Sequence, residues 1–197
     1  GYREVSFVAN HYNPRPLWDY MHQRYEEFER WLPSSLGIPP GELAILTTGA
    51  DMDNLAVCER SYREFVMCCL ATAGVKGNAQ RMGVDEADSV EKDGRFESLS
   101  GTINIILLTN ATLNDEAMAR SIITATEAKT AALQDMDIRS TYTPENQATG
   151  TGTDNIIVVS GGGPLVSYTG GHAKMGELIG MTTKRAVTEA IERQEAD

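Results

Sequence analysis

The sequence predicts an α/β (mixed α+β) fold, in which one layered domain has a central mixed sheet flanked by helices. Five short apolar segments have the length and composition of strands, and three longer segments have helical spacing. No repeat, low-complexity tract or linker divides the 197 residues. Because that length suits one domain with a substantial core, we expect a single domain over residues 1–197.

The first half of the chain contains most of the predicted strands. Strands rich in apolar residues are predicted over residues 3–10, 43–48 and 63–74. Residues 17–32 have apolar side chains at helical spacing, and His22 within them has the surface or capping role usual for a lone histidine. The proline-rich segment that follows should end this helix at Leu32. Residues 75–100 are polar and weakly periodic, which indicates a long surface loop.

The second half alternates strands with helices. Residues 102–110 give the clearest strand, and residues 155–160 another. Residues 114–136 form a strong predicted helix, because Asn114 is a good N-cap and acidic residues fill the first turn. Its apolar face should include Ile122 and Ile123. A last helix is predicted over residues 173–195.

Composition excludes several classes of protein. The formal charge of -11 and the pI near 4.7 argue against nucleic-acid binding. The apolar runs are too short for a membrane span and no leader peptide opens the chain, so we expect a cytoplasmic protein. Cys58, Cys68 and Cys69 suit reduced core thiols. We expect no metal site, since no ligand spacing typical of zinc or calcium occurs.

A glycine–threonine loop, "ATGTGTD" at residues 148–154, precedes the strand 155–160. Glycines let a ligand approach the main chain, so the amides near Gly150 and Gly152 suit an anion or an oxyanion. The hydroxyls that accompany them, as donors or nucleophiles, belong to Thr149, Thr151 and Thr153. The alternative is a tight turn capped by Asp154.

Two further segments combine polar groups that suit catalysis. In "GGHAKMGEL", Gly171 and His172 open the last helix, where the helix dipole favours a neutral imidazole. Lys174 and Glu177 share one face of that helix. The alternatives are a capping histidine and a solvated ion pair. Glu127 in "TATEAK" is either exposed or, if buried near the loop, a general acid or base.

The longest of these motifs resemble one known family. "GTINIILLTNATLNDEAMARSIITATEAKTAAL", "QATGTGTDNIIVV" and "YTGGHAKMGELIG" are similar to signature blocks of the adenosylcobinamide amidohydrolases, the CbiZ family. "REVSFVANHY", which carries Asn10 and His11, and "LAILTTGADM" resemble looser blocks of that family. The resemblance covers residues 3 to about 191. Members usually have a further N-terminal segment with a glycine-rich stretch, so we expect part of a strand or of the site to lie outside these 197 residues.

The resemblance implies hydrolysis of the amide that joins aminopropanol to the corrin ring of adenosylcobinamide, in corrinoid (coenzyme B12) salvage. The corrinoid is then the substrate, and no cofactor is required. The alternative is a non-catalytic corrinoid-binding or tetrapyrrole-binding protein that uses the same groove. The resemblance leaves the oligomeric state open, and a homo-oligomer is compatible with it.

A mechanism for this hydrolysis needs a nucleophile, oxyanion stabilisation and an acid for the leaving amine. We assign oxyanion binding to the amides around Gly150 and Gly152. His172 or Glu127 would activate water, and Asp154 would orient His172 or a bound water. Nucleophilic attack by Thr151 or Thr153 is the covalent variant. Asn10, His11, Thr149, Gly171, Lys174 and Glu177 complete the predicted substrate contacts.

Overall fold

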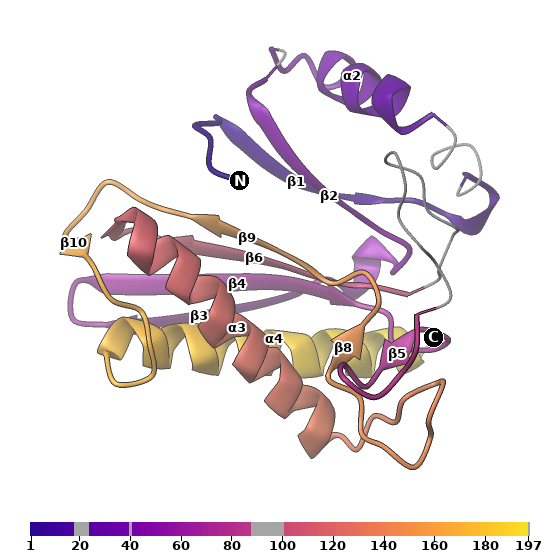
Figure 1. Ribbon diagram of the computed structural model, residues 1–197. Helices are drawn as coiled ribbons and strands as arrows, with labels where there is room; N and C mark the ends of the chain where they lie inside the picture. Colours follow the sequence, from indigo (N-terminus) through magenta and orange to yellow (C-terminus); the bar gives the residue numbers. More distant parts are fainter. Residues whose placement is uncertain (18–23, 40, 88–100, 197) are drawn as a thin grey trace.

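The structure, a computed structural model, describes residues 1–17, 24–39, 41–87 and 101–196 (Figure 1). In this part of the chain the largest sheet has four strands, in the order β3-β4-β6-β9. The strands β3 (Ala56–Tyr62), β4 (Phe65–Ala73) and β6 (Ile103–Thr109) are antiparallel neighbours, and β9 (Asn155–Val159) runs parallel to β6. A mixed sheet with helices confirms the predicted α/β class.

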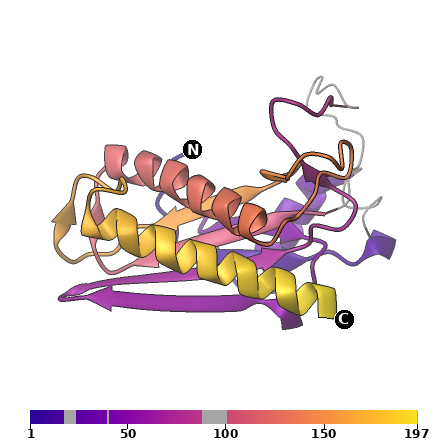
Figure 2. The same cartoon turned by 90° about the horizontal axis from the view of Figure 1, so that it is seen from below.

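One face of this sheet is covered by the two long helices α3 (Asp115–Asp135) and α4 (Lys174–Ala196), which pack against each other and lie side by side when seen from below (Figure 2). Alternate residues of β6, beginning with Ile103 and Ile105, are fully buried against them. The predicted N-cap is confirmed: the Asn114 side chain accepts a hydrogen bond from the amide of Ala117 at 3.0 Å. The main core therefore lies between the sheet and these helices.

A separate unit lies over the other face of the sheet (Figure 1). Strands β1 (Phe7–Tyr12) and β2 (Leu43–Thr48) pair in parallel, and α2 (Tyr25–Ser35) packs on them through a small core of its own. That core contains Phe28, Leu32 and Leu43. The unit brings Asn10 of β1 to the four-stranded sheet.

Short elements fasten the loops at the two ends of the large sheet. At one end β5 (Ala79–Gln80) pairs with β8 (Gly150–Thr151), next to the starts of β6 and β9. At the other end β7 (Thr112–Leu113) pairs with β10 (Leu165–Val166), just after β6 and β9 finish. Two short 3-10 helices, η1 (Arg15–Leu17) and η2 (Met52–Asn54), complete the described elements.

The first predicted helix is displaced in the structure. Its residues 18–23, which include His22, lie outside the described residues, and α2 continues through Pro33 to Ser35. Ending the helix at Leu32 was therefore wrong. The helix stops where Gly37 adopts φ +68° and the amide of Ile38 donates to the Pro33 carbonyl at 2.8 Å. Proline removes one amide donor but leaves its carbonyl free for this cap.

Strand boundaries also differ from the prediction. The first strand begins at Phe7 rather than residue 3 and includes His11 and Tyr12, because β2 pairs with it that far. Strand β3 was not predicted, since its charged residues interrupt the apolar alternation. Its position at the edge of the sheet tolerates those charges.

The predicted surface loop 75–100 is partly wrong. Residues 88–100 lie outside the described residues, whereas Val75, Asn78 and Ala79 are buried and β5 pairs with the glycine–threonine loop. A two-residue strand is too short to leave a periodic signal in the sequence. Among the described residues, no helix is long and apolar enough to cross a membrane.

Candidate functional site

The glycine–threonine loop is fastened by a buried ion pair. Lys129 of α3 is only 7% exposed, and its ammonium group contacts Oδ2 of Asp154, at the end of the loop. The same Oδ2 accepts the amide of Thr151 at 3.0 Å, and Oδ1 accepts the Thr151 hydroxyl at 2.5 Å. Oδ1 also accepts the amide of Ile103 at 3.1 Å. Asp154 thus ties the loop to α3 and to the start of β6.

The two glycines of the loop, Gly150 and Gly152, differ in how little space a side chain would have at each position. A Cβ on Gly150 would lie 2.3 Å from Oδ2 of Asp154 and 2.6 Å from Nζ of Lys129. Gly150 is therefore required by the ion pair, which occupies the space of any side chain. A Cβ on Gly152 would meet the side-chain oxygens of Asn78 and Gln80 at 3.2 and 3.3 Å, a tight but less severe contact.

The loop is a turn capped by Asp154, and its tip is open to solvent. Gly152 and Thr153 are exposed, whereas Thr151 is 6% exposed. The Thr153 hydroxyl donates to the Gly101 carbonyl at 2.7 Å, and the Thr153 carbonyl accepts the Thr102 hydroxyl at 2.6 Å. The tip is accordingly the part of the loop that solvent reaches. Thr149, farther back, bonds to Gln80 instead.

A polar network joins the β1–β2 unit to the large sheet close to this loop. The Asn104 carboxamide donates to Oδ1 of Asn10 and to the Thr47 carbonyl, both at 2.8 Å. Asn10 in turn donates to the Thr72 hydroxyl at 2.9 Å. Asn10, a predicted substrate contact, thus lies at the sheet beside Asn104 and Thr72, which the sequence reasoning missed. An asparagine inside the apolar strand "INIILL" was the available signal.

His11 does not join this network. Its neighbour Asn10 points to the large sheet, so the His11 ring points to the other side of the strand. There it contacts the Phe28 ring edge-on, with the centroids 5.0 Å apart, and Nδ1 lies 2.7 Å from Oδ1 of Asn13. The structure thus places the partly buried His11 against Phe28 of the small core.

The residues around His172 lie at the opposite end of the sheet. Gly171 and His172 are exposed in the turn before α4, and Lys174 stands 4.7 Å above the ring of Tyr62, the last residue of β3. Asp154, by contrast, contacts Ile103 at the start of β6. The strands between these ends span about 20 Å at ~3.3 Å per residue.

This separation between the loop and His172 is not compatible with the predicted contact between Asp154 and His172. The geometry does not allow Asp154 to orient His172, because each oxygen of Asp154 is bonded within the loop, β6 and α3. Lys174 and Glu177 form a 2.6 Å ion pair with both side chains about 40% exposed. That pair matches the solvated alternative for these two residues.

The segment "TATEAK" contributes Lys129 to the loop rather than Glu127. Glu127 is exposed, whereas Thr124 is buried and donates to the Thr169 carbonyl at 2.9 Å. The expected apolar face was wrong here, since Ile122 and Ile123 are 45% and 47% exposed. The small side chains of α3 face the core, which lets the helix pack closely on α4.

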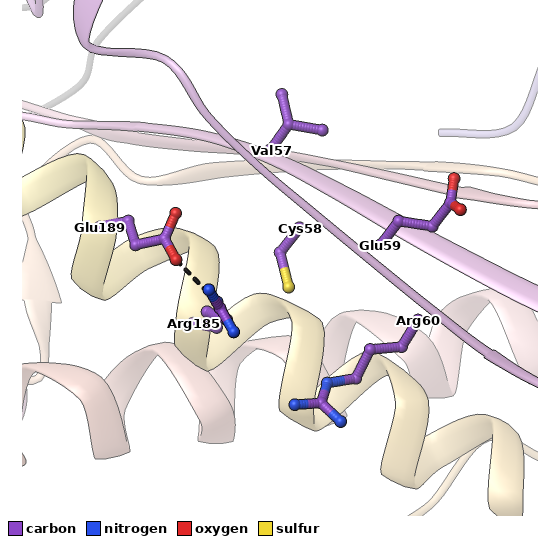
Figure 3. Close-up of a pocket in the computed structure, with 6 residues that line it drawn as sticks. All are labelled: Val57, Cys58, Glu59, Arg60, Arg185 and Glu189. Carbon is purple, nitrogen blue, oxygen red and sulfur yellow. Dashed lines mark hydrogen bonds and ion pairs between the residues drawn. The ribbon is translucent and has the colours of Figure 1, made fainter.

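A hollow of about 430 Å³ lies elsewhere, between the edge strand β3 and α4 (Figure 3). Cys58 and Arg60 point toward the helix in this view, and Arg185 is paired with Glu189 at 2.7 Å. None of the predicted site residues lines this hollow.

Potential metal ligands and cysteines were located among the described residues. Among them, no three His, Cys, Asp or Glu side chains lie close enough together to hold a metal ion. The three cysteines are unpaired with one another. Burial raises the pKa of the Cys69 thiol to about 12, so this sulfur is not a thiolate near neutral pH.

Comparison with known proteins points to one family. The sequence model of that family, described as adenosylcobinamide amidohydrolase, matches residues 1–197. An uncharacterised protein of Methanocaldococcus jannaschii is 51% identical over 205 residues, which cover 99% of this chain and 80% of that protein. A Methanosarcina mazei protein named adenosylcobinamide amidohydrolase is 29% identical over 202 residues, or 98% and 86% of the two chains. No solved structure matches.

Proposed function

The chain belongs to the adenosylcobinamide amidohydrolase family, and we propose that it hydrolyses the amide between aminopropanol and the corrin ring of adenosylcobinamide. Water adds across the C–N bond, so that the carbonyl carbon gains the hydroxyl of adenosylcobyric acid and the nitrogen leaves as aminopropanol. The acid then re-enters coenzyme B12 synthesis, which makes the reaction a step of corrinoid salvage. The observation that carries this proposal is the match of the family over the whole chain.

The geometry favours the tip of the glycine–threonine loop as the reacting end. Gly152 and Thr153 are exposed there, and the buried pair of Lys129 and Asp154 holds the loop from behind. Because the amides of Thr149 and Thr151 already donate to Gln80 and Asp154, oxyanion binding is proposed at the tip around Gly152, where the main chain is held in place without reorganising. In this proposal Asp154 is a positioning residue, and the Thr153 hydroxyl is the covalent nucleophile or the group that orients water.

His172 belongs to a competing version of the site. It is exposed beside the start of α4, about 20 Å from the loop by strand length. A single scissile amide cannot contact both ends. Activation of water by His172 therefore requires that the amide bind away from the loop tip. Glu127 is exposed two residues before Lys129, on the helix that contacts the loop, so it stays compatible with the loop tip.

Incubation of the protein with adenosylcobinamide, followed by chromatography for adenosylcobyric acid, tests the function. We expect adenosylcobyric acid and aminopropanol in equal amounts. Spectroscopic binding of the corrinoid without product would instead support the non-catalytic binding protein. Absence of both binding and product would refute the proposal.

Two single variants, Thr153→Ala and His172→Ala, test which end of the sheet carries the catalytic site. We expect Thr153→Ala to lower kcat by about 10²-fold or more, because removal of a positioned catalytic group has that effect. His172→Ala should leave kcat within about threefold of the unchanged protein. The reverse result would move the reacting end to the start of α4. Both residues are exposed, so neither substitution disturbs the core.

A further inference from the structure

A row of polar side chains crosses the face of the large sheet that the β1–β2 unit partly covers. The strand register places Thr72 of β4, Asn104 of β6 and Asn155 of β9 abreast. Ile103 and Ile105 point to the helices, so Asn104 points to the other face. With strands about 4.8 Å apart, the three groups form one continuous line. We call these three residues the polar row.

The central member of the polar row has an unused acceptor. Asn104 is 1% exposed, and its Oδ1 has no hydrogen-bond partner among the described residues. The orientation of this carboxamide is fixed, because its nitrogen faces two acceptors, Oδ1 of Asn10 and the Thr47 carbonyl. A flipped carboxamide would leave oxygen against oxygen. Buried polar atoms without a partner are rare in native structures, and a ligand supplies the missing partner in some of them.

Apolar side chains continue from the polar row along the same face. The next row contains Leu70, Ile106 and Ile157, and the row after it contains Cys68, Leu108 and Val159. Apart from Ile106, these side chains are only partly buried. The face therefore offers an apolar floor edged on one side by carboxamide and hydroxyl groups.

The row is accessible from one side. Thr72 and Asn104 are nearly fully buried beneath β1, whereas Asn155 lies on the edge strand β9 and is exposed. The Asn155 carboxamide donates to the Thr153 carbonyl at 2.9 Å, so the exposed end of the row adjoins the loop tip. A molecule that touches Asn155 is therefore next to Thr153.

We propose that the polar row binds carboxamide side chains on the rim of the corrinoid, while the apolar rows pack against its macrocycle. This inference rests on the proposed function. A corrinoid carries carboxamide arms around a flat ring, and each carboxamide offers two donors and one acceptor. Oδ1 of Asn104 lies beneath β1 and accepts the N–H of an arm that enters there, while the exposed Asn155 exchanges hydrogen bonds with a neighbouring arm. The arm that bears aminopropanol then lies over Thr153.

The test compares Asn155→Ala and Asn104→Ala with Gln134→Ala, which removes an exposed carboxamide from α3 on the other side of the sheet. Steady-state kinetics with adenosylcobinamide and equilibrium dialysis of adenosylcobyric acid are measured for each. We expect Asn155→Ala to raise KM and the product Kd about tenfold, with kcat within about twofold. Asn104→Ala should raise KM and the product Kd at least as much, and Gln134→Ala should change neither KM nor Kd. Circular dichroism checks that each variant is folded.

If folded Asn155→Ala has an unchanged KM and an unchanged Kd, the polar row is not a substrate site. The proposed function would still hold in that case, provided that the unsubstituted protein turns over adenosylcobinamide. A fall in kcat with unchanged KM would also overturn the polar row as a substrate site, because a binding role predicts the opposite division. If the unsubstituted protein binds adenosylcobyric acid but forms no product, the proposed function fails, and the Kd values alone decide the inference. If it binds no corrinoid, both fail.

Discussion

The buried pair of Lys129 and Asp154 gives the sharpest prediction for stability. In Asp154→Asn the remaining oxygen still accepts from the Thr151 hydroxyl and the Ile103 amide. The new amide nitrogen replaces Oδ2, which accepted from Lys129 and from the Thr151 amide. The Lys129 ammonium group and the Thr151 amide, both donors, then face the new NH₂ group, which is also a donor. The positive charge of Lys129 loses its carboxylate partner, although its side chain is only 8% exposed. We therefore expect the substitution to destabilise the fold strongly.

The magnitude follows from burial. Removing one partner of a buried ion pair destabilises a protein by about 3–5 kcal/mol. The matched control is Glu177→Gln, which breaks the 2.6 Å pair with Lys174 where both side chains are about 40% exposed. An exposed pair contributes ~0–1 kcal/mol. Replacing both partners, as in Lys129→Met with Asp154→Asn, removes the unpaired charge. That double variant should be more stable than the sum of the single effects by more than ~1 kcal/mol.

Urea denaturation followed by circular dichroism measures these differences. With a slope of about 2 kcal/mol per molar urea, a loss of 3 kcal/mol lowers the midpoint by about 1.5 M. Glu177→Gln should shift it by less than about 0.5 M. An Asp154→Asn midpoint within about 0.3 M of the unsubstituted protein, or strictly additive single effects, would refute the buried-pair reasoning.

Three further outcomes follow from local contacts. Gly150→Ala should destabilise the fold by about 1–3 kcal/mol in thermal unfolding, since its Cβ would enter the ion pair, whereas Gly162→Ala, with nothing within 4 Å, should have little effect. Desolvation acts to raise the pKa of Asp85, but hydrogen bonds from Ser140, Thr143 and the Arg81 amide hold it below its usual value. Its stabilising effect is therefore present above the unfolded pKa of about 4 and lost as pH falls through the lower folded value. Asp85→Asn should remove that part of the acid sensitivity in pH-dependent unfolding, and an unchanged pH profile would contradict this assignment. Cys69, with its pKa raised to about 12, should resist iodoacetamide at pH 8 until the protein is unfolded, and mass spectrometry of the labelled peptides would reveal any earlier reaction.

The strongly patterned elements were predictable from the sequence. The capped helix α3 and the apolar strands β4, β6 and β9 agree with the predictions to within about two residues. Strand β3 was missed because Glu59 and Arg60 break its alternation, which an edge strand permits. The pairing partners of a strand and its position at a sheet edge depend on the assembled sheet, so the residue pattern of a single segment does not reveal them.

The candidate site was only partly predictable for the same reason. The loop and Asp154 were found from their composition, but the partner of Asp154 is Lys129, twenty-five residues earlier on a helix. The sequence placed His172 near the loop because both segments are glycine-rich. The topology puts them at opposite ends of β9, since the chain must run the length of that strand between them. Asn104 was missed because a single polar residue in an apolar strand has no distinctive spacing.

The parallel pairing of β6 with β9 has a consequence for folding kinetics. The hydrogen bond from the Ile103 amide to Asp154 joins residues 51 apart, whereas β3 and β4 meet through a tight hairpin. Long-range contacts form late because closing their loops costs entropy before the contacts stabilise the chain. The Asp154 contacts should thus be absent from the folding transition state. Asp154→Asn would then leave the refolding rate nearly unchanged and shorten the lifetime of the folded protein.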